Sequence, residues 1–182
     1  MTAPTVVWFK RDLRTLDHEP LARAAQEGPC LCLYVYEPEV LLADDYDPTH
    51  LVFLNRCLES LASELEQLGS SLVVRVGEAV SVLEQLHDEL KFTTLRSHQE
   101  TGNDITYRRD LRVARWAATA GVTWVESIQD GVVRRLDNRD GWARQWDAFM
   151  RQPQFDAPAR LVGCAPLPSL GLQTHEQLGL AP

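Results

Sequence analysis

The sequence predicts an α/β fold: a Rossmann-like five-stranded parallel sheet with helices on both faces, followed by a linker tail. Two observations predict this fold class. Short apolar runs rich in β-branched residues alternate along the chain with longer segments in which leucine recurs every three or four positions, as strands and helices do. The first apolar run, at residues 5–9, is continuous, which is typical of a parallel strand that helices cover on both faces.

The first part of the chain predicts two strands with a helix between them. Residues 5–9 (TVVWF) and 30–36 (CLCLYVY) have the composition of buried strands, and residues 19–27 are expected to form the helix. A proline in its first turn and a glycine after its last residue suit the two ends of that helix. Residues 37–49 carry an acidic patch, and we expect them to form a loop.

A long amphipathic helix is expected next, over residues 50–68. Gly69 can end it in a left-handed conformation. Six leucines at spacings of three and four place its apolar face toward the sheet: Leu51, Leu54, Leu58, Leu61, Leu65 and Leu68.

The remaining elements continue the alternation. In the last predicted helix, Trp142 and Trp146 lie one turn apart and share a face. We expect that face either to pack in the core or to meet a partner domain. The further strands are expected at residues 72–76, 92–97 and 122–125, and the further helices at residues 78–90, 104–120 and 141–151.

The composition changes after Pro153. Residues 152–182 are rich in proline, glycine and leucine and show no clear periodicity, which indicates a linker that lies along a surface. We therefore expect one α/β domain over residues 1–151 and a linker over residues 152–182. A length of 182 residues suits one domain with a tail.

Composition and charge exclude several classes of protein. Hydrophobic residues make up 45% of the chain, which is too many for a disordered protein. No apolar run approaches the ~20 residues of a membrane helix. The formal net charge of -8 would repel DNA, so a free-standing DNA-binding domain is not expected. The N-terminus lacks the pattern of a signal peptide, which predicts a cytoplasmic protein.

Common catalytic and metal-binding motifs are absent from the sequence. Neither G-x-G-x-x-G nor G-x-x-x-x-G-K-[ST] occurs, and there is no G-x-S-x-G elbow. Cys30 and Cys32 lie two apart on a predicted strand, where packing in the core is favoured over a metal site. We therefore expect no catalytic residue and no metal ligand in this chain.

Parallel sheets bind ligands outside the carboxyl ends of their strands, near the point where the strand order reverses. This rule selects the turns after the first, second and fourth strands, at residues 10–14, 36–39 and 98–104. The first turn, KRDLR, is either a site for an anionic or polar ligand or a loop held by a pair between Asp12 and an arginine. His98 is either a structural histidine, which we favour, or a ligand contact.

The opening segment, VVWFKRDLRTLDHEPLARAA, resembles the start of DNA photolyases and cryptochromes. In that family a strand precedes [WF]-F-[RK]-[RK]-D-L-R and a Pro-Leu-x-x-A helix. The resemblance covers about residues 5 to 150, and the tail resembles the interdomain linker of the family. Further similar segments occur in the family's order: LYVYEP (33–38), FLNRCLESLASEL (53–65), LVVRVGEAVSVL (72–83) and SHQETGNDITYRRD (97–110).

This resemblance implies the N-terminal α/β domain of a deoxyribodipyrimidine photolyase or cryptochrome-like protein. In the family, this domain holds an antenna chromophore (a folate, deazaflavin, flavin or lumazine) and passes excitation to FAD in an all-helical second domain. That FAD-binding domain is absent from the chain, so we expect either a fragment, which we favour, or a natural short relative, without catalysis of its own. The helical domain is the expected partner and the expected route to DNA, and no membrane partner is expected. The parent protein would be a lyase that repairs DNA with light, or a blue-light signalling protein.

The resemblance also implies which residues contact the chromophore. Residues 98–103 depart from the family's commoner N-E-x-Y form, which indicates a subgroup with a different antenna or none. Two other functions remain open: a nucleotide-binding domain of the universal-stress or adenine-nucleotide hydrolase type, and a structural docking domain with an empty pocket. The contacts implied by family position are Lys10, Arg11, Tyr36, Glu37, His98, Gln99, Glu100, Asn103 and Asp104.

Overall fold

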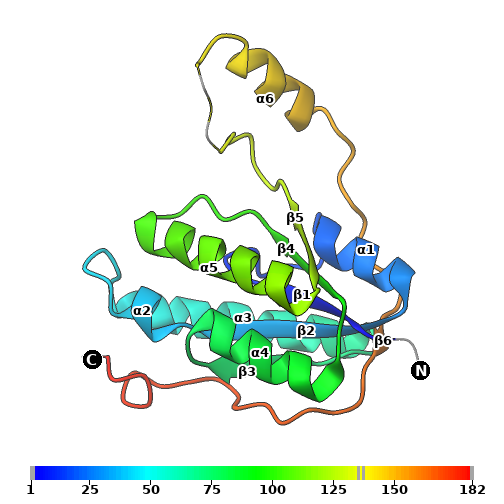
Figure 1. The fold of residues 1–182 in the computed structure, drawn as a ribbon, viewed down its shortest axis with the longest axis vertical. Coiled ribbons are helices and arrows are strands. Elements are labelled where there is room, and N and C mark those ends of the chain that lie inside the picture. Colours follow the sequence, from blue (N-terminus) through cyan, green and yellow to red (C-terminus); the bar gives the residue numbers. More distant parts are fainter. Residues whose placement is uncertain (1–2, 135, 137, 181–182) are drawn as a thin grey trace.

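The computed structural model describes residues 3–134, 136 and 138–180 of the chain. Five parallel strands form one sheet in the order β3-β2-β1-β4-β5, which confirms the predicted fold class (Figure 1). The order reverses between β1 and β4, because the chain builds the sheet outward from β1 to β3 and then continues on the other side of β1. The strands are β1 (Thr5–Phe9), β2 (Pro29–Tyr36), β3 (Leu72–Val76), β4 (Thr94–His98) and β5 (Thr123–Ser127).

Helices cover both faces of the sheet. The side chains of β1 alternate between two cores, with Val7 and Phe9 in one and Val6 and Trp8 in the other. Every residue of β1 is buried, which explains why its apolar run is continuous. Within the described ranges, no helix has both the length and the apolar character needed to cross a membrane. The first core is covered by α1 (Glu19–Glu27) and α3 (Thr49–Gln67), and the second by α4 (Ala79–Leu90) and α5 (Asp104–Ala120).

The segment between β2 and α3 is not entirely a loop, so that prediction is wrong in part. It contains the one-turn helix α2 (Pro38–Leu41). Pro38 occupies the first turn, where the missing N–H of proline has no helical partner to lose. Leu41 is buried in the core that α3 covers. Four residues are too few to show a helical period, and pattern recognition therefore misses this helix.

The C-terminal segment follows the surface of the domain, and we call residues 161–180 the strap. Its two-residue strand β6 (Val162–Gly163) pairs with the beginning of β2. Farther along, the Val74 N–H of the edge strand β3 donates to Ser169 Oγ (3.0 Å), and the Leu170 N–H donates to the Val74 carbonyl (3.1 Å). The strap thus covers an edge whose backbone groups would otherwise face solvent. The sequence predicts the surface path of this segment but not its pairing with the sheet.

Helix α6 (Trp142–Met150) stands apart from the sheet and its covering helices (Figure 1). None of its side chains is buried, and Trp142 and Trp146 are 38% and 42% exposed. The Trp146 ring lies directly against Gly131, where a larger side chain would overlap it, and Trp142 Nε1 donates to the Gly131 carbonyl (3.1 Å). The interpretation of this face as core is therefore wrong. The two rings form a partly open apolar surface that rests on the preceding loop.

Candidate functional site

A cavity of about 670 Å³ opens at the carboxyl ends of β1 and β2. It is bounded by the turn after β1, the end of β2, the segment after β4 and the N-terminal half of α3. Sites for small ligands typically span about 300–1,000 Å³. The cavity lies beside the point where the strand order reverses, which is where open parallel sheets bind their ligands.

The outer wall of the cavity is apolar. Phe53, Leu54 and Cys57 of α3 contribute to it, together with Tyr46 from the segment ahead of α3. Their spacing along α3 places these side chains on one face of the helix. The Phe53 side chain is 72% exposed, so its ring is available to a ligand. This wall offers apolar contacts to a flat ring.

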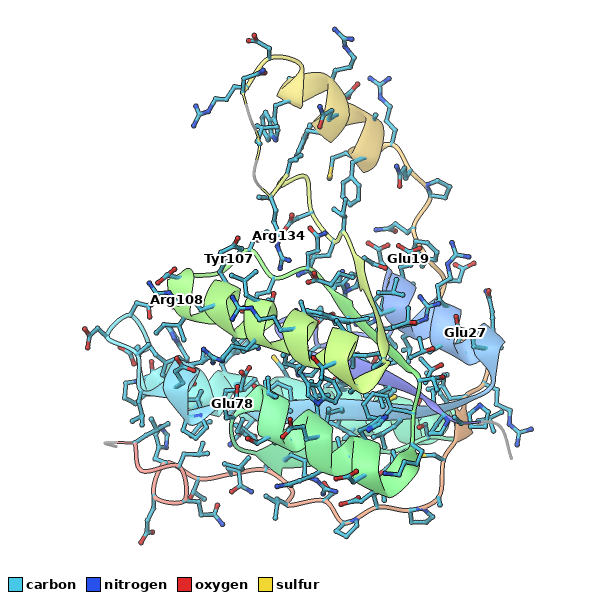
Figure 2. The ribbon with its side chains drawn as sticks, in the orientation of Figure 1. Glu19, Glu27, Glu78, Tyr107, Arg108 and Arg134 are labelled. Carbon is cyan, nitrogen blue, oxygen red and sulfur yellow. The ribbon has the colours of Figure 1, made fainter. Side chains whose placement is uncertain are left out.

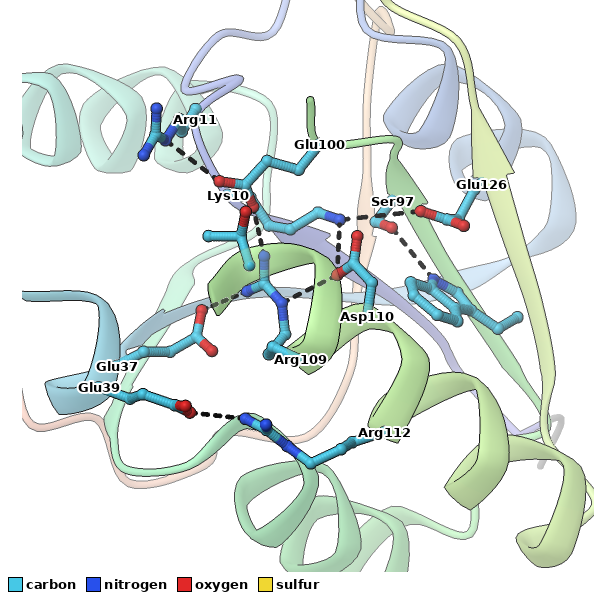
Figure 3. A network of polar contacts seen from close by, with 12 residues as sticks. Lys10, Arg11, Glu37, Glu39, Ser97, Glu100, Arg109, Asp110, Arg112 and Glu126 are labelled. Carbon is cyan, nitrogen blue, oxygen red and sulfur yellow. Dashed lines mark hydrogen bonds and ion pairs between the residues drawn. The ribbon is translucent and has the colours of Figure 1, made fainter. Parts of the chain in front are cut away.

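The inner wall is charged, and the buried Arg109 of α5 holds two of its carboxylates, Glu37 and Glu100 (Figure 3). Its guanidinium contacts the carboxylates of Glu37, Glu100 and Asp110. It also lies over the Trp8 ring, with 4.7 Å between Arg109 Cζ and the ring centre. Burial alone would lower the pKa of Arg109, but the three carboxylates raise it above its usual range. The guanidinium therefore stays charged and holds three segments of the chain together.

Lys10 follows β1, but its ammonium group turns toward α5 and β5. Its Nζ lies 3.6 Å from Asp110, 4.0 Å from Glu126 and 5.0 Å from the centre of the Trp8 ring. Burial is the main cause that lowers the pKa of Lys10, against the opposing effect of Asp110. Alternation along β1 explains the direction, since Lys10 continues the face of Val6 and Trp8.

Arg134 completes the charged network from the loop after β5 (Figure 2). Its Nη2 lies 2.9 Å from Asp110, and its Nη1 lies 3.0 Å from Glu126. Arg11 is the cation on the cavity side, with 3.1 Å between its Nε and Glu100. Each buried carboxylate of the network therefore has a cation beside it, as buried charges require.

Glu37 gives the inner wall a carboxylate oxygen that can accept a hydrogen bond from a ligand. One of its oxygens contacts Arg109, and no described residue hydrogen-bonds to the other, Oε2. Burial raises the pKa of Glu37 to about 7, Glu100 and Asp110 add to the increase, and Arg109 opposes it. Both oxygens of Glu100, in contrast, are engaged by Arg11 and Arg109. A ligand with a polar edge can therefore donate a hydrogen bond to Glu37.

The raised pKa of Glu37 predicts a pH-dependent stability. An unfolded glutamate ionises near pH ~4.3, whereas folded Glu37 keeps its proton up to about pH 7. The folded state binds more protons in this window, so its stability falls as pH rises from about 4 to about 7. We expect Glu37→Gln to be more stable than the wild type at pH 8, by up to about 3 kcal/mol, and equally stable at pH 4. Urea unfolding at both pH values measures this, and an equal difference at both would contradict the assignment to Glu37.

Behind the first turn, Asp12 joins two histidines in a buried cluster. His18 Nε2 and His98 Nδ1 lie 2.8 Å and 2.7 Å from Asp12 Oδ2, and the Lys10 N–H donates to Asp12 Oδ1 (2.7 Å). His18 Nδ1 accepts from the Leu21 N–H (3.1 Å) and so caps α1. The proton of neutral His18 therefore sits on Nε2, which donates to Asp12. The predicted pair between Asp12 and an arginine is wrong, because histidines take that place.

The ligand atoms of Asp12, His18 and His98 lie close enough together to hold a metal ion. A metal at His18 Nε2 would use the lone pair there and move the ring proton to Nδ1, which accepts from the Leu21 N–H in the structure. Neutral histidine has one proton for its two nitrogens, so the cap and a metal at Nε2 compete. The contacts therefore favour a hydrogen-bonded structural cluster over a metal site.

The cavity brings together five of the nine residues that the family resemblance implies. Arg11 extends at the mouth of the cavity, with its side chain 63% exposed. Asn103 accepts from the Thr106 N–H (3.1 Å) at the start of α5 and donates to Asp45. The five cavity residues are Lys10, Arg11, Glu37, Glu100 and Asn103.

The other four residues do not line the cavity. The Tyr36 hydroxyl donates to α3, and His98 belongs to the cluster around Asp12. The Gln99 N–H continues the pairing with β5 by donating to the Ser127 carbonyl (2.8 Å). Asp104 is exposed and pairs with Arg108, one turn further along α5 (2.8 Å).

Two features of the site are not predicted from the sequence: the α3 wall, and Arg109, which does not line the cavity but holds Glu37 and Glu100 in its inner wall. Phe53 gives a signal for the wall, because it lies outside the leucine stripe of an amphipathic helix. Arg109 gives only the run YRRD, since two of its three carboxylate partners, Glu37 and Glu100, come from other segments of the chain. Contacts of that kind depend on the packed fold.

A family model described as DNA photolyase matches residues 5–141, which is most of the chain. The chain belongs to the DNA photolyase family. A deoxyribodipyrimidine photo-lyase of Synechococcus sp. is 28% identical to it over 98% of this chain and 41% of the relative's length. This chain thus spans less than half of that photolyase. The family match favours the photolyase interpretation over the adenine-nucleotide alternative.

Solved structures of the photolyase family share the fold. A cryptochrome of Synechocystis sp. has a TM-score of 0.78 at 21% identity. The match covers 97% of this chain and 40% of the cryptochrome chain. An archaeal photolyase of Sulfolobus tokodaii, solved with two FAD molecules and described as implying a novel light-harvesting cofactor, has a TM-score of 0.67 at 19% identity. That match covers 88% of this chain and 37% of the archaeal photolyase chain. The chain corresponds to the N-terminal α/β domain of the photolyase family.

Proposed function

We propose that this chain binds an antenna chromophore, namely a folate, deazaflavin, flavin or lumazine, in the cavity at the carboxyl ends of β1 and β2. The bound chromophore absorbs light and passes excitation to FAD in a helical domain of the same parent protein. The observation that carries the proposal is the cavity, which combines a volume of about 670 Å³ with one apolar and one charged wall. The light-harvesting cofactor implied for the Sulfolobus tokodaii photolyase supports the same assignment.

The residues of the cavity suit a flat heteroaromatic ring. Phe53 and Leu54 can cover one face of the ring. Glu37 can accept a hydrogen bond from a ring N–H or amino group, and Arg11 can reach an anionic group at the mouth. The role is optical: the cavity removes water from the chromophore and holds it rigid. No residue of this chain is assigned a bond-breaking step.

An absorption titration of the purified chain tests this proposal. The panel comprises riboflavin, FMN, methenyltetrahydrofolate, 8-hydroxy-5-deazaflavin and dimethylribityllumazine, each added at constant protein concentration. We expect one compound to bind saturably, with a shifted absorption band and an equimolar endpoint. If none binds, the antenna proposal fails, and the domain with an empty pocket that serves as a structural partner becomes the favoured function.

Phe53→Ala is expected to weaken chromophore binding about tenfold. The change removes an aromatic contact in the apolar wall, and such contacts contribute about 0.5–1.5 kcal/mol beyond the buried area. Val52→Ala is the matched control, because Val52 is also exposed on α3 but does not line the cavity. Titration of both variants with the same chromophore measures the difference. Equal losses in the two variants would place the ligand elsewhere.

We also propose that the open face of α6 docks on the FAD-binding helical domain of the parent protein. Trp142 and Trp146 are half-open, and Met150 is exposed on the same helix. Apolar side chains gathered in this way are typical of docking surfaces. Hydroxyl-radical footprinting compares this chain alone with the chain joined to a photolyase FAD-binding domain. We expect the joined form to protect both tryptophans, and unchanged labelling would rule out docking through α6.

The parent activity follows from the family and remains a proposal for this chain. It is either light-driven reversal of pyrimidine dimers through reduced FAD or blue-light signalling. DNA would contact the helical domain, since this chain carries a formal net charge of -8. A repair assay on dimer-containing oligonucleotides with the joined protein separates the two activities, because only a photolyase converts the dimer back to two separate pyrimidines under light.

A further inference from the structure

We propose that Asn55 is a positioning residue that ties the α3 wall of the cavity to the strap, so that filling the cavity and docking the strap stabilise each other. The part that concerns the ligand rests on the proposed function. The contacts that tie Asn55 to the strap do not depend on any ligand.

Asn55 uses both ends of its side-chain amide. Its Oδ1 accepts a hydrogen bond from the Tyr36 hydroxyl (2.5 Å), and its Nδ2 donates to the Gln173 carbonyl of the strap (2.8 Å). Tyr36 and Gln173 are both buried. An amide engaged at both ends has one orientation, so this junction fixes β2, α3 and the strap relative to one another.

The Tyr36 hydroxyl keeps its role as donor across the pH range of ordinary experiments. Burial raises the pKa of Tyr36 to about 12, against the opposing effect of the Gln173 backbone. The phenol therefore keeps its proton, and Asn55 Oδ1 remains its acceptor. The tie does not loosen when Glu37 titrates.

The junction lies between the two walls of the cavity. Asn55 shares a helical face with the buried Leu58, while the neighbouring Leu54 lines the cavity. Tyr36 ends β2 and directly precedes Glu37 of the inner wall. A shift at Asn55 therefore changes the distance between the apolar wall and the charged wall.

The strap also holds α3 near both of its ends. The Leu161 N–H donates to the Leu68 carbonyl just after α3 (2.7 Å), and His175 Nε2 lies 2.7 Å from the Pro48 carbonyl just before it. Leu178 is buried in the same core as the leucines of α3. The strap therefore contacts the helix at its beginning, at Asn55 and at its end.

Two events that require the same position of α3 are thermodynamically linked. A ligand against Phe53 and Leu54 favours that position, and a docked strap favours it through Asn55. The linkage is reciprocal, so the factor by which the docked strap raises ligand affinity is also the factor by which the ligand raises strap docking. Occupancy of the cavity is thereby transmitted to the C-terminal end of the strap.

Hydrogen exchange read by mass spectrometry tests the proposal on the full chain. We expect Asn55→Ala to speed exchange in peptides of the strap about tenfold, because both hydrogen bonds of the junction are lost. Exchange in α5 serves as the internal reference and should not change. Ser60→Ala is the control, because Ser60 lies exposed on α3 and its hydroxyl donates to Glu64 of the same helix, away from the strap. In the wild type, saturating riboflavin should slow exchange of the strap, and Asn55→Ala should lose that protection.

Each outcome of this experiment decides a separate point. Unchanged strap exchange in Asn55→Ala, or equal acceleration in α5, overturns the positioning role. Riboflavin that binds the wild type without protecting the strap overturns the linkage. Riboflavin that does not bind counts against a flavin antenna, while the ligand-free comparison still decides the role of Asn55. If Asn55→Ala does not fold, Tyr36→Phe gives a smaller form of the comparison, because it removes the donor that orients the Asn55 amide and keeps the ring.

Discussion

Arg109→Met should destabilise the domain by about 3–5 kcal/mol at pH 7, which is typical when one partner of a buried ion pair is removed. The guanidinium is the contact shared by Glu37, Glu100 and Asp110, and methionine leaves these three buried carboxylates with less positive charge around them. Urea unfolding followed by circular dichroism measures the loss. The inner wall of the cavity should also be disrupted, since two of the three carboxylates line it.

Arg112→Met is the matched control for this prediction. Arg112 lies one turn along α5 and pairs with Glu39 and Glu78, but all three side chains are substantially exposed. Exposed pairs contribute about 0–1 kcal/mol, so this variant should remain close to the wild type. Lowering the pH should rescue Arg109→Met in part, because protonation removes the repulsion between its carboxylates. Similar losses in both variants would show that the Arg109 network adds no more than a surface pair.

The sheet could be predicted because its signal is local. The strands β1 and β2 are continuous apolar runs, and the crossover helices α3 and α4 repeat leucine at helical spacing. The two missed elements lack such a signal. Helix α2 has one turn, and β6 has two residues whose pairing with Pro29 and Cys30 arises only when the strap returns to the sheet.

The location of the cavity could be predicted from the sequence, but the side chains that form its two walls could not. The sheet rule selects the correct edge, because every parallel strand ends there. Strand alternation explains why Lys10, although it lines the cavity, directs its ammonium group to the face that α5 covers. The Tyr36 hydroxyl donates to Asn55, and His98 contacts Asp12, instead of the cavity. Those partners are distant in sequence, so no local sequence pattern predicts the contacts.

The second large effect is expected at Asp12. Asp12→Ala should cost about 3–5 kcal/mol, because it leaves three buried donors without an acceptor. These are His18 Nε2, His98 Nδ1 and the Lys10 N–H. Asp12→Asn should not restore the loss. Its NH₂ group must face one of these donors, and the cap on the Leu21 N–H prevents His18 from changing its tautomer.

The stability that Asp12 contributes has a defined pH window. Burial alone would raise the pKa of Asp12, but hydrogen bonds from His18 and His98 hold it well below its usual range. A carboxyl group with a lowered pKa contributes its full stability above the unfolded value of ~3.9 and loses it as the pH falls further. The difference in unfolding free energy between the wild type and Asp12→Asn should therefore be constant from pH 5 to 7 and shrink below about pH 4.

His98→Asn separates the cluster from the cavity. An asparagine at this position can still donate to Asp12 but leaves part of the space of the ring empty, so we expect a loss of about 1–2 kcal/mol, well below that of Asp12→Ala. Chromophore affinity should stay near the wild-type value in His98→Asn, since His98 does not line the cavity. It should fall in Asp12→Asn, because Asp12 fixes the backbone of Lys10 beside Arg11 at the cavity mouth. Equal affinities in the two variants would mean that the first turn holds its shape without Asp12, and the cluster would then serve only the stability of the fold.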